Sequence, residues 1–113
     1  MTGTHILIDI SNIQDNDKLK YSSSIFPIMD KIVEQFQLNV VAKASHQFEP
    51  FGFTGVYVLS ESHLSIHTFV EERKIALDLY TCYFFDYSKE LYEIMRNEFG
   101  EECEIHLNII KRK

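Results

Sequence analysis

The sequence predicts an α+β fold, a two-layer α/β sandwich with a mostly antiparallel sheet and two helices on one face. Two observations support this prediction. Apolar residues alternate with polar ones in several short segments, as in half-buried strands, and recur every three or four positions in two longer ones, as in amphipathic helices. The order is strand, helix, several strands, helix, strand. Two helices cover only one face, so we expect the other to be polar or to meet a second sheet.

The first two elements differ in the period of their apolar residues. Residues 5–10 read HILIDI and alternate, so we expect a strand whose isoleucines share one face. A polar, loop-like stretch follows. Residues 24–39 then carry apolar side chains at helical spacing. We expect a helix of about three turns there, with Ser24 as its N-cap and Pro27 in the first turn, where proline is tolerated.

The middle of the chain consists of short apolar or alternating runs separated by turn residues. β-branched and aromatic residues dominate the runs, and glycine, proline or charged residues separate them. We therefore expect several consecutive strands. The expected strands are 40–45, 55–60, 63–69 and 75–84, with connections at 46–53 and 71–74.

The last two elements are a helix and a strand. Residues 88–99 place apolar side chains on one face at helical spacing. Ser88 can cap this helix and Gly100 can end it. Residues 104–110 alternate again, and we expect them to form the last strand of the sheet.

Size and charge limit the class of protein. A chain of 113 residues with 45% hydrophobic residues fits one globular domain over 1–113. The formal charge of −6 argues against a nucleic-acid binder, which would present a basic face. The apolar run near the N-terminus is too short for a signal peptide or a membrane span, so no membrane partner is expected. Cys82 and Cys103 lack metal-type spacing, and with no export signal we expect a reducing cytoplasmic location.

The segment LSESHLSIHT, residues 59–68, carries an unusual number of reactive groups for a strand. It holds three serines, two histidines and a glutamate within ten positions. His63 and His67 are four residues apart, which in a strand is about 13 Å, too far for both to hold one ion. We therefore expect no metal site here and look to the serines and histidines themselves.

This segment resembles the core of the prokaryotic-type S-adenosylmethionine decarboxylases, small pyruvoyl-dependent enzymes made as inactive proenzymes. The block SESHLSIHT is preceded by TGVYVL (54–59) and followed by ALDLYTC (76–82), and FEPFGFTGV (48–56) also fits the family pattern. A nine-residue block with two flanking motifs at matching distances is a specific signal. The resemblance implies that the chain belongs to this family of lyases in spermidine biosynthesis.

The chemistry of such a lyase requires an electron sink. Loss of CO₂ from an amino acid leaves a carbanion that no protein side chain delocalises, so a carbonyl cofactor is needed. The four glycines are scattered and form no phosphate cradle for pyridoxal phosphate. The resemblance implies that the carbonyl is a pyruvoyl group made from the chain itself, which forms a Schiff base with the substrate amine.

The resemblance also implies how that group arises. Ser62 would attack the carbonyl carbon of Glu61 and convert the peptide into an ester. β-Elimination would then release Glu61, and hydrolysis would leave a pyruvoyl group on residue 62. Cleavage between 61 and 62 would give chains 1–61 and 62–113.

Further roles follow from the same resemblance. His67 matches the histidine that promotes the elimination, as a neutral imidazole that can act as a base. Thr54 matches a hydroxyl that assists processing. Cys82 matches the cysteine that protonates the α-carbon after CO₂ leaves, for which its thiol must stay protonated.

Substrate recognition is where the sequence departs from the family pattern. Phe48 and Phe69 match positions that stack on the adenine ring, and Glu71 matches the carboxylate that holds the ribose hydroxyls. Most family members have Trp-Pro where this chain has Phe69 and Val70. We expect that losing the proline frees the turn that positions Glu71.

Three hypotheses follow. The first is a self-processing decarboxylase of S-adenosylmethionine. The second keeps the pyruvoyl chemistry but changes the substrate to ornithine, arginine or another amino acid. The third is an unprocessed, non-catalytic relative that binds a partner. The free sheet face and the family resemblance together predict a homodimer, a heterotetramer by chain count after cleavage.

Overall fold

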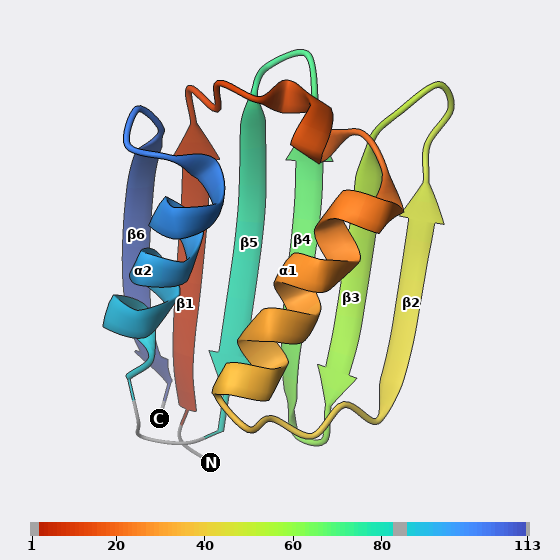
Figure 1. Cartoon of the computed structure of the whole chain (residues 1–113). Coiled ribbons are helices and arrows are strands. Elements are labelled where there is room, and N and C mark those ends of the chain that lie inside the picture. The colour runs from red at the N-terminus through yellow and green to blue at the C-terminus, as the bar shows by residue number, and fades with distance from the viewer. Residues whose placement is uncertain (1–2, 83–85, 113) are drawn as a thin grey trace.

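The computed structural model describes residues 3–82 and 86–112 and shows one sheet backed by helices (Figure 1). Within these residues six strands pair in the order β2-β3-β4-β5-β1-β6, and every pairing is antiparallel. The strands are β1 (Gly3–Ser11), β2 (Ala42–Gln47), β3 (Phe53–Leu59), β4 (Ser62–Phe69), β5 (Lys74–Thr81) and β6 (Glu104–Arg112).

Two α-helices lie on the same face of this sheet (Figure 1). α1 (Ser22–Gln35) follows a 3₁₀ helix, η1 (Asn16–Leu19), and α2 (Ser88–Phe99) connects β5 to β6. The predicted α+β two-layer sandwich with two helices on one face is therefore confirmed. None of the described helices is long and apolar enough to cross a membrane.

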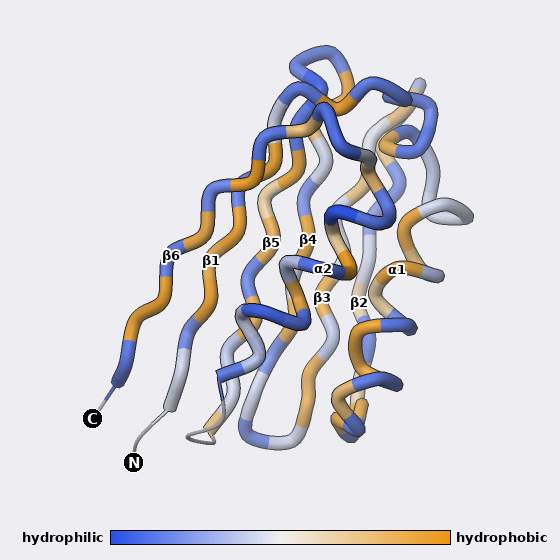
Figure 2. The backbone as a smooth tube through the Cα atoms, turned by 60° about the vertical axis from the view of Figure 1, so that its left-hand side comes forward, coloured by the Kyte–Doolittle hydropathy of each residue, from blue (hydrophilic) through white to orange (hydrophobic). Residues whose placement is uncertain are grey.

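The other face of the sheet carries no helix, and we call it the free face (Figure 2). Side chains alternate between the two faces, and directly opposite residues of an antiparallel pair share a face. The strand register therefore places polar residues and a few exposed apolar ones here. All five histidines of the chain lie on the free face, namely His5, His46, His63, His67 and His106.

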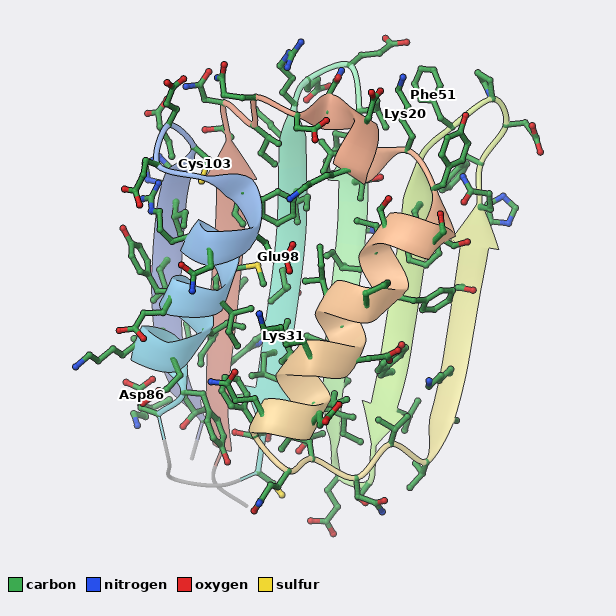
Figure 3. The ribbon with its side chains drawn as sticks, viewed as in Figure 1. Lys20, Lys31, Phe51, Asp86, Glu98 and Cys103 are labelled. Atoms are coloured by element: carbon green, nitrogen blue, oxygen red, sulfur yellow. The ribbon has the colours of Figure 1, made fainter. Side chains whose placement is uncertain are left out.

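The N-terminal caps of both helices differ from the prediction. α1 starts at Ser22, so Ser24 is its third residue rather than its N-cap, and Pro27 lies in the second turn. Its first amide donates to Oε1 of Gln47, 2.7 Å away. Ser88 is the first residue of α2 and not its N-cap. Its amide donates a hydrogen bond to Oδ1 of Asp86, 2.8 Å away; Asp86 lies just before the helix (Figure 3). Acceptors outside the helices thus set both starting points.

Several expected boundaries also move by a few residues. The strand expected at 40–45 lies at Ala42–Gln47, and the loop expected before α1 contains η1. The strand expected at 75–84 ends at Thr81 within the described residues, and its predicted positions 83 and 84 lie outside them. The second helix, in contrast, spans 88–99 as predicted, and Gly100 ends it with a φ of +91°.

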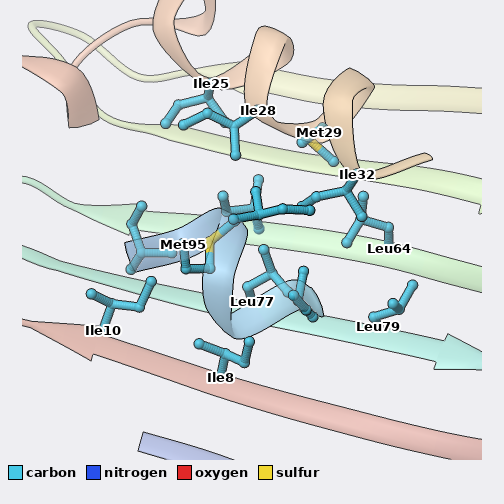
Figure 4. Close-up of a cluster of buried hydrophobic side chains, with 14 of the residues drawn as sticks. Ile8, Ile10, Ile25, Ile28, Met29, Ile32, Leu64, Leu77, Leu79 and Met95 are labelled. Carbon is cyan, nitrogen blue, oxygen red and sulfur yellow. The ribbon is translucent and has the colours of Figure 1, made fainter. Parts of the chain in front are cut away.

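The core lies between the helices and the sheet (Figure 4). Leu64 and Ile66 of β4 are fully buried there against Met29 and Ile32 of α1 and their neighbours. Fully burying one such side chain stabilises the fold by about 1.5–3 kcal/mol. This packing fixes the path of β4, the strand that carries three of the predicted site residues, Ser62, His67 and Phe69.

Candidate active site

The predicted cleavage bond follows a tight turn between β3 and β4. Leu59 pairs with Ser62, so the loop consists of Ser60 and Glu61 alone. Ser60 has a φ of +54°. A left-handed conformation costs a non-glycine residue roughly 1–2 kcal/mol. Backbone strain is therefore stored one residue before the bond between 61 and 62.

Ser62 is the first residue of β4, and its side chain is directed toward the helix-covered face. It is only 7% exposed. Its Oγ accepts a hydrogen bond from the backbone N–H of Cys82 at 3.2 Å. The structure thus brings together two of the predicted catalytic residues, and we call Glu61, Ser62 and Cys82 the serine end.

The remaining predicted residues meet at the opposite end of β4. A pocket of about 480 Å³ is lined by Phe48, Thr54, His67, Phe69 and Glu71, among others. This volume is typical of a small-molecule site. We call these five residues the histidine pocket.

Two side chains of the histidine pocket contact each other, and two others present exposed rings. Oγ1 of Thr54 and Nδ1 of His67 lie 3.1 Å apart, within hydrogen-bond distance. Phe48 and Phe69 are 47% and 46% exposed, so both rings offer a free surface to a ligand. Large aromatic side chains with that much exposed area are suited to stacking on a planar base.

The two ends of the site are far apart within one chain. Ser62 and His67 are five residues apart on β4, which corresponds to about 17 Å. An odd separation also places their side chains on opposite faces. Ser62 faces the helices, whereas His67 is exposed on the free face. In a single chain, His67 therefore cannot contact Ser62.

A cluster of His5, His63, Tyr80 and Asp78 lies on the free face, next to the serine end. The ring of His63 lies 5.9 Å from that of His5 and 5.7 Å from that of Tyr80. Nε2 of His5 is 3.8 Å from Oδ2 of Asp78. Burial, with repulsion from His5, lowers the pKa of His63, and Asp78 opposes this shift in part. His5 could not be singled out from the sequence, because its contacts come from other strands.

The turn that carries Glu71 is held in place without a proline. Val70 is buried in the core, and its carbonyl accepts a hydrogen bond from the Arg73 amide. The Arg73 side chain donates to the carbonyls of Ile13 and Gln14 at 3.1 and 2.7 Å. The expectation that losing the proline frees this turn is therefore corrected, because Arg73 anchors it to the segment after β1.

Other pocket residues were not predicted. Glu49, Phe51 and Glu72 also line the pocket. They occur within the FEPFGF and VEER segments, which also contain Phe48 and Glu71. Their position next to these two residues in the sequence could have identified them as pocket residues. Among residues 3–82 and 86–112, no three histidine, cysteine, aspartate or glutamate side chains gather as a metal site would require.

The serine end fits the group that the sequence implies. A pyruvoyl precursor needs a serine at a cleavable bond, shielded from bulk water, with a proton donor nearby. Ser62 is buried, follows the strained turn and is held by the backbone of Cys82.

Comparison with known proteins gives three consistent results. The family model described as S-adenosylmethionine decarboxylase matches residues 4–113. An S-adenosylmethionine decarboxylase proenzyme of Clostridium botulinum is 36% identical over 81 residues, which are 72% of this chain and 69% of that protein. One from Picrophilus torridus is 38% identical over 80 residues, covering 71% and 61%.

A solved structure resembles this one over nearly its whole length. The crystal structure of the adenosylmethionine decarboxylase from Aquifex aeolicus superposes with a TM-score of 0.79 and 27% sequence identity. The match covers 94% of this chain and 88% of the other. Fold and sequence therefore point to the same group of proteins.

Proposed function

This chain belongs to the S-adenosylmethionine decarboxylase family, and we infer that it is a self-processing proenzyme of a pyruvoyl-dependent carboxy-lyase acting on S-adenosylmethionine. Its product serves spermidine biosynthesis. One observation supports this most strongly: Ser62 begins β4 directly after the strained turn, with its Oγ held by the amide of Cys82. A reactive serine at such a turn is what chain cleavage requires.

We propose that Ser62 makes the pyruvoyl group by an N→O acyl shift. Its Oγ forms a bond to the carbonyl carbon of Glu61 as the C–N bond breaks, and the freed nitrogen takes the hydroxyl proton. Loss of the α-proton of residue 62 then breaks the Cβ–O bond and releases the Glu61 carboxylate. Hydrolysis frees ammonia and leaves the pyruvoyl group at the start of 62–113. Strain at Ser60 favours breaking this bond.

Cys82 is the proposed proton donor at the substrate α-carbon. Its backbone amide contacts Ser62, so Cys82 lies beside the residue that becomes the pyruvoyl group. That group supplies the electron sink for the charge left by CO₂. A thiol is kept reduced in the cytoplasm, the location that we propose for the chain.

The histidine pocket is the proposed site for the nucleoside part of the substrate. Phe48 and Phe69 present half-exposed rings, and Glu71 also lines the pocket. The rings can stack on adenine, and the carboxylate can accept hydrogen bonds from ribose hydroxyls. Ser62, the proposed pyruvoyl precursor, does not line this pocket, so the reaction requires the pocket to lie next to a serine end.

We propose that the two ends meet across a homodimer. Within one chain, about 17 Å and the thickness of the sheet separate Ser62 from His67. The free face also exposes apolar side chains without cover in the chain, including Val58 and Ile110. A second copy on this face would bury them and supply a histidine pocket to each serine end.

A mixed-chain experiment tests this arrangement. His67→Ala should stay uncleaved alone, because its partner also lacks the histidine. Co-expressed with Ser62→Ala, the His67→Ala chain should be cleaved, because its intact Ser62 now meets the His67 of the other chain. Failure of cleavage in the mixture, or a monomer by sedimentation at micromolar concentration, would refute the composite site. Cleavage of His67→Ala alone would refute the role of His67.

The substrate is tested by release of labelled CO₂. The purified chain should release it from carboxyl-labelled S-adenosylmethionine. Relatives named as S-adenosylmethionine decarboxylase proenzymes favour this substrate over the other amino acids. Release from ornithine or arginine instead would support the second hypothesis. No release from any of the three, with an intact chain, would support the non-catalytic relative.

A further inference from the structure

The side chain of Gln47 joins two segments that would otherwise be separate loops. Its Oε1 accepts the amide hydrogen of Ser22 at 2.7 Å, and its Nε2 donates to the carbonyl of Lys20 at 2.8 Å. The same Nε2 donates to the carbonyls of Gly52 and Phe48 at 2.8 and 3.3 Å. One amide therefore ties the start of α1 to both ends of the loop from 48 to 52.

Backbone hydrogen bonds complete this junction. The amide of Phe48 donates to the carbonyl of Gly52, and the amide of Gly52 donates to the carbonyl of Lys20, both at 2.8 Å. Lys20 also lies over the ring of Phe51, 5.5 Å from its centroid, and both side chains are at the same end of the molecule (Figure 3). The loop is therefore closed on itself and anchored to the residues before α1.

This loop carries one wall of the histidine pocket. Phe48, Glu49, Phe51 and Gly52 all line it. Phe48 is 47% exposed, and its one ring contact among the described residues is a T-shaped pair with His46, whose centroid lies 4.5 Å from that of Phe48. Its position therefore depends mainly on its backbone, and that backbone is held by Gln47.

We propose that Gln47 is a positioning residue for substrate recognition, because its side-chain amide fixes the loop that presents Phe48 to the nucleoside. This inference rests on the proposed function of the pocket. Gln47 faces the helix side of the sheet, so it acts through the loop and does not touch the substrate. Its hydrogen bonds reach neither Ser62 nor the proposed processing residues Thr54 and His67, so we expect chain cleavage to proceed without it.

Two variants test the proposal. Gln47→Glu keeps the shape and the acceptor for Ser22 but places a carboxylate oxygen against three carbonyl oxygens. Gln47→Ala removes the junction altogether. We expect KM for S-adenosylmethionine to rise on the order of tenfold, which corresponds to about 1.4 kcal/mol. We expect kcat to stay within about twofold and cleavage to proceed at the normal rate.

Binding of 5′-methylthioadenosine, measured by calorimetry on the cleaved protein, provides a readout independent of turnover. Its Kd should rise by the same factor as KM. Gln35→Ala, at the exposed end of α1, is the matched control and should change neither value. Circular dichroism and thermal melting establish that each variant is folded.

The outcomes separate this inference from the proposed function. Unchanged KM and Kd in a folded Gln47 variant would overturn the positioning role, as would a loss of cleavage in parallel with the loss of binding. If the wild-type chain binds 5′-methylthioadenosine in a Gln47-dependent way but releases no CO₂, the inference stands and the proposed reaction fails.

Discussion

At the scale of single residues, Ser60 holds a left-handed backbone one residue before the proposed cleavage bond. Ser60→Gly should remove about 1–2 kcal/mol of strain from the precursor, partly offset by the greater freedom of glycine in the unfolded chain. Cleavage should become about two- to fivefold slower, because less strain is relieved on breaking the bond. The rate is followed by a denaturing gel after rapid purification.

Asn12→Gly provides the control for this effect. Asn12 has a similar φ of +56° just after β1, at the opposite end of the sheet from the proposed cleavage bond. The substitution should change thermal stability in the same direction as Ser60→Gly and leave the cleavage rate unchanged. Equal slowing in both variants would show that the local strain at residue 60 plays no part.

Cys82 contacts Ser62 through its backbone, while its proposed chemistry belongs to its thiol. Cys82→Ala keeps the amide donor and removes the proton donor. We therefore expect near-normal cleavage and a fall in kcat of about 10²-fold or more, in the range typical of losing a general acid. Single-turnover CO₂ release on cleaved protein measures it. A variant that turns over normally would exclude the thiol as donor.

The lowered pKa of His63 makes stability depend on pH. Burial, and then repulsion from His5, disfavours the protonated form in the folded state. As pH falls below about 6.5, the unfolded chain takes up a proton that the folded chain resists, so folding becomes less favourable in that window. Guanidinium unfolding of Ser62→Ala protein between pH 8 and 5 should show a smaller loss of stability when His63→Gln is added. Identical pH profiles would contradict this.

At the scale of elements, the turn between β4 and β5 depends on Arg73. Arg73→Ala removes the hydrogen bonds to Ile13 and Gln14. Each is worth about 0.5–1.5 kcal/mol net, so thermal stability should fall measurably. Because the same turn carries Glu71, KM for S-adenosylmethionine should rise several-fold with little change in cleavage. Lys89→Ala, on α2, serves as control. An unchanged KM would separate this turn from substrate binding.

The elements themselves could largely be read from the sequence, because local periodicity determines them. Helix 88–99 and the alternating isoleucines of β1 follow directly from apolar spacing. The starts of the helices could not be read in the same way. Gln47, 25 residues beyond Ser22, supplies the acceptor for the first amide of α1. When the capping acceptor belongs to another element, the residues at the helix start do not reveal it. The prediction of Ser24 as the N-cap is wrong for this reason.

The same limit applies to the turn after β4. The sequence showed that a proline was missing, but the compensating contacts run from Arg73 to residues about 60 positions away. Tertiary contacts of this kind become visible only when the strands are assembled. The aromatic and acidic residues beside the pocket were nevertheless within the segments that the sequence singled out.

At the scale of the whole molecule, the predicted site residues divide into two groups. Ser62 and His67 are five positions apart in the sequence, and the family resemblance assigns both to chain cleavage. Residues separated by an odd number of positions on a strand have their side chains on opposite faces. The sequence alone therefore indicates that Ser62 and His67 do not meet within one chain. The free face carries His67 and the other four histidines, and it is the surface where we propose that a second chain completes the site.

The intact mass of the purified protein tests the central claim most directly. If Ser62 cleaves the chain, two fragments should appear, residues 1–61 and residues 62–113 with a blocked, carbonyl-bearing first residue. Phenylhydrazine should add once to the second fragment and not to the first. Ser62→Ala should give a single full-length mass with no adduct. A wild-type chain that keeps its full-length mass after prolonged incubation, and takes up no phenylhydrazine, would contradict the account.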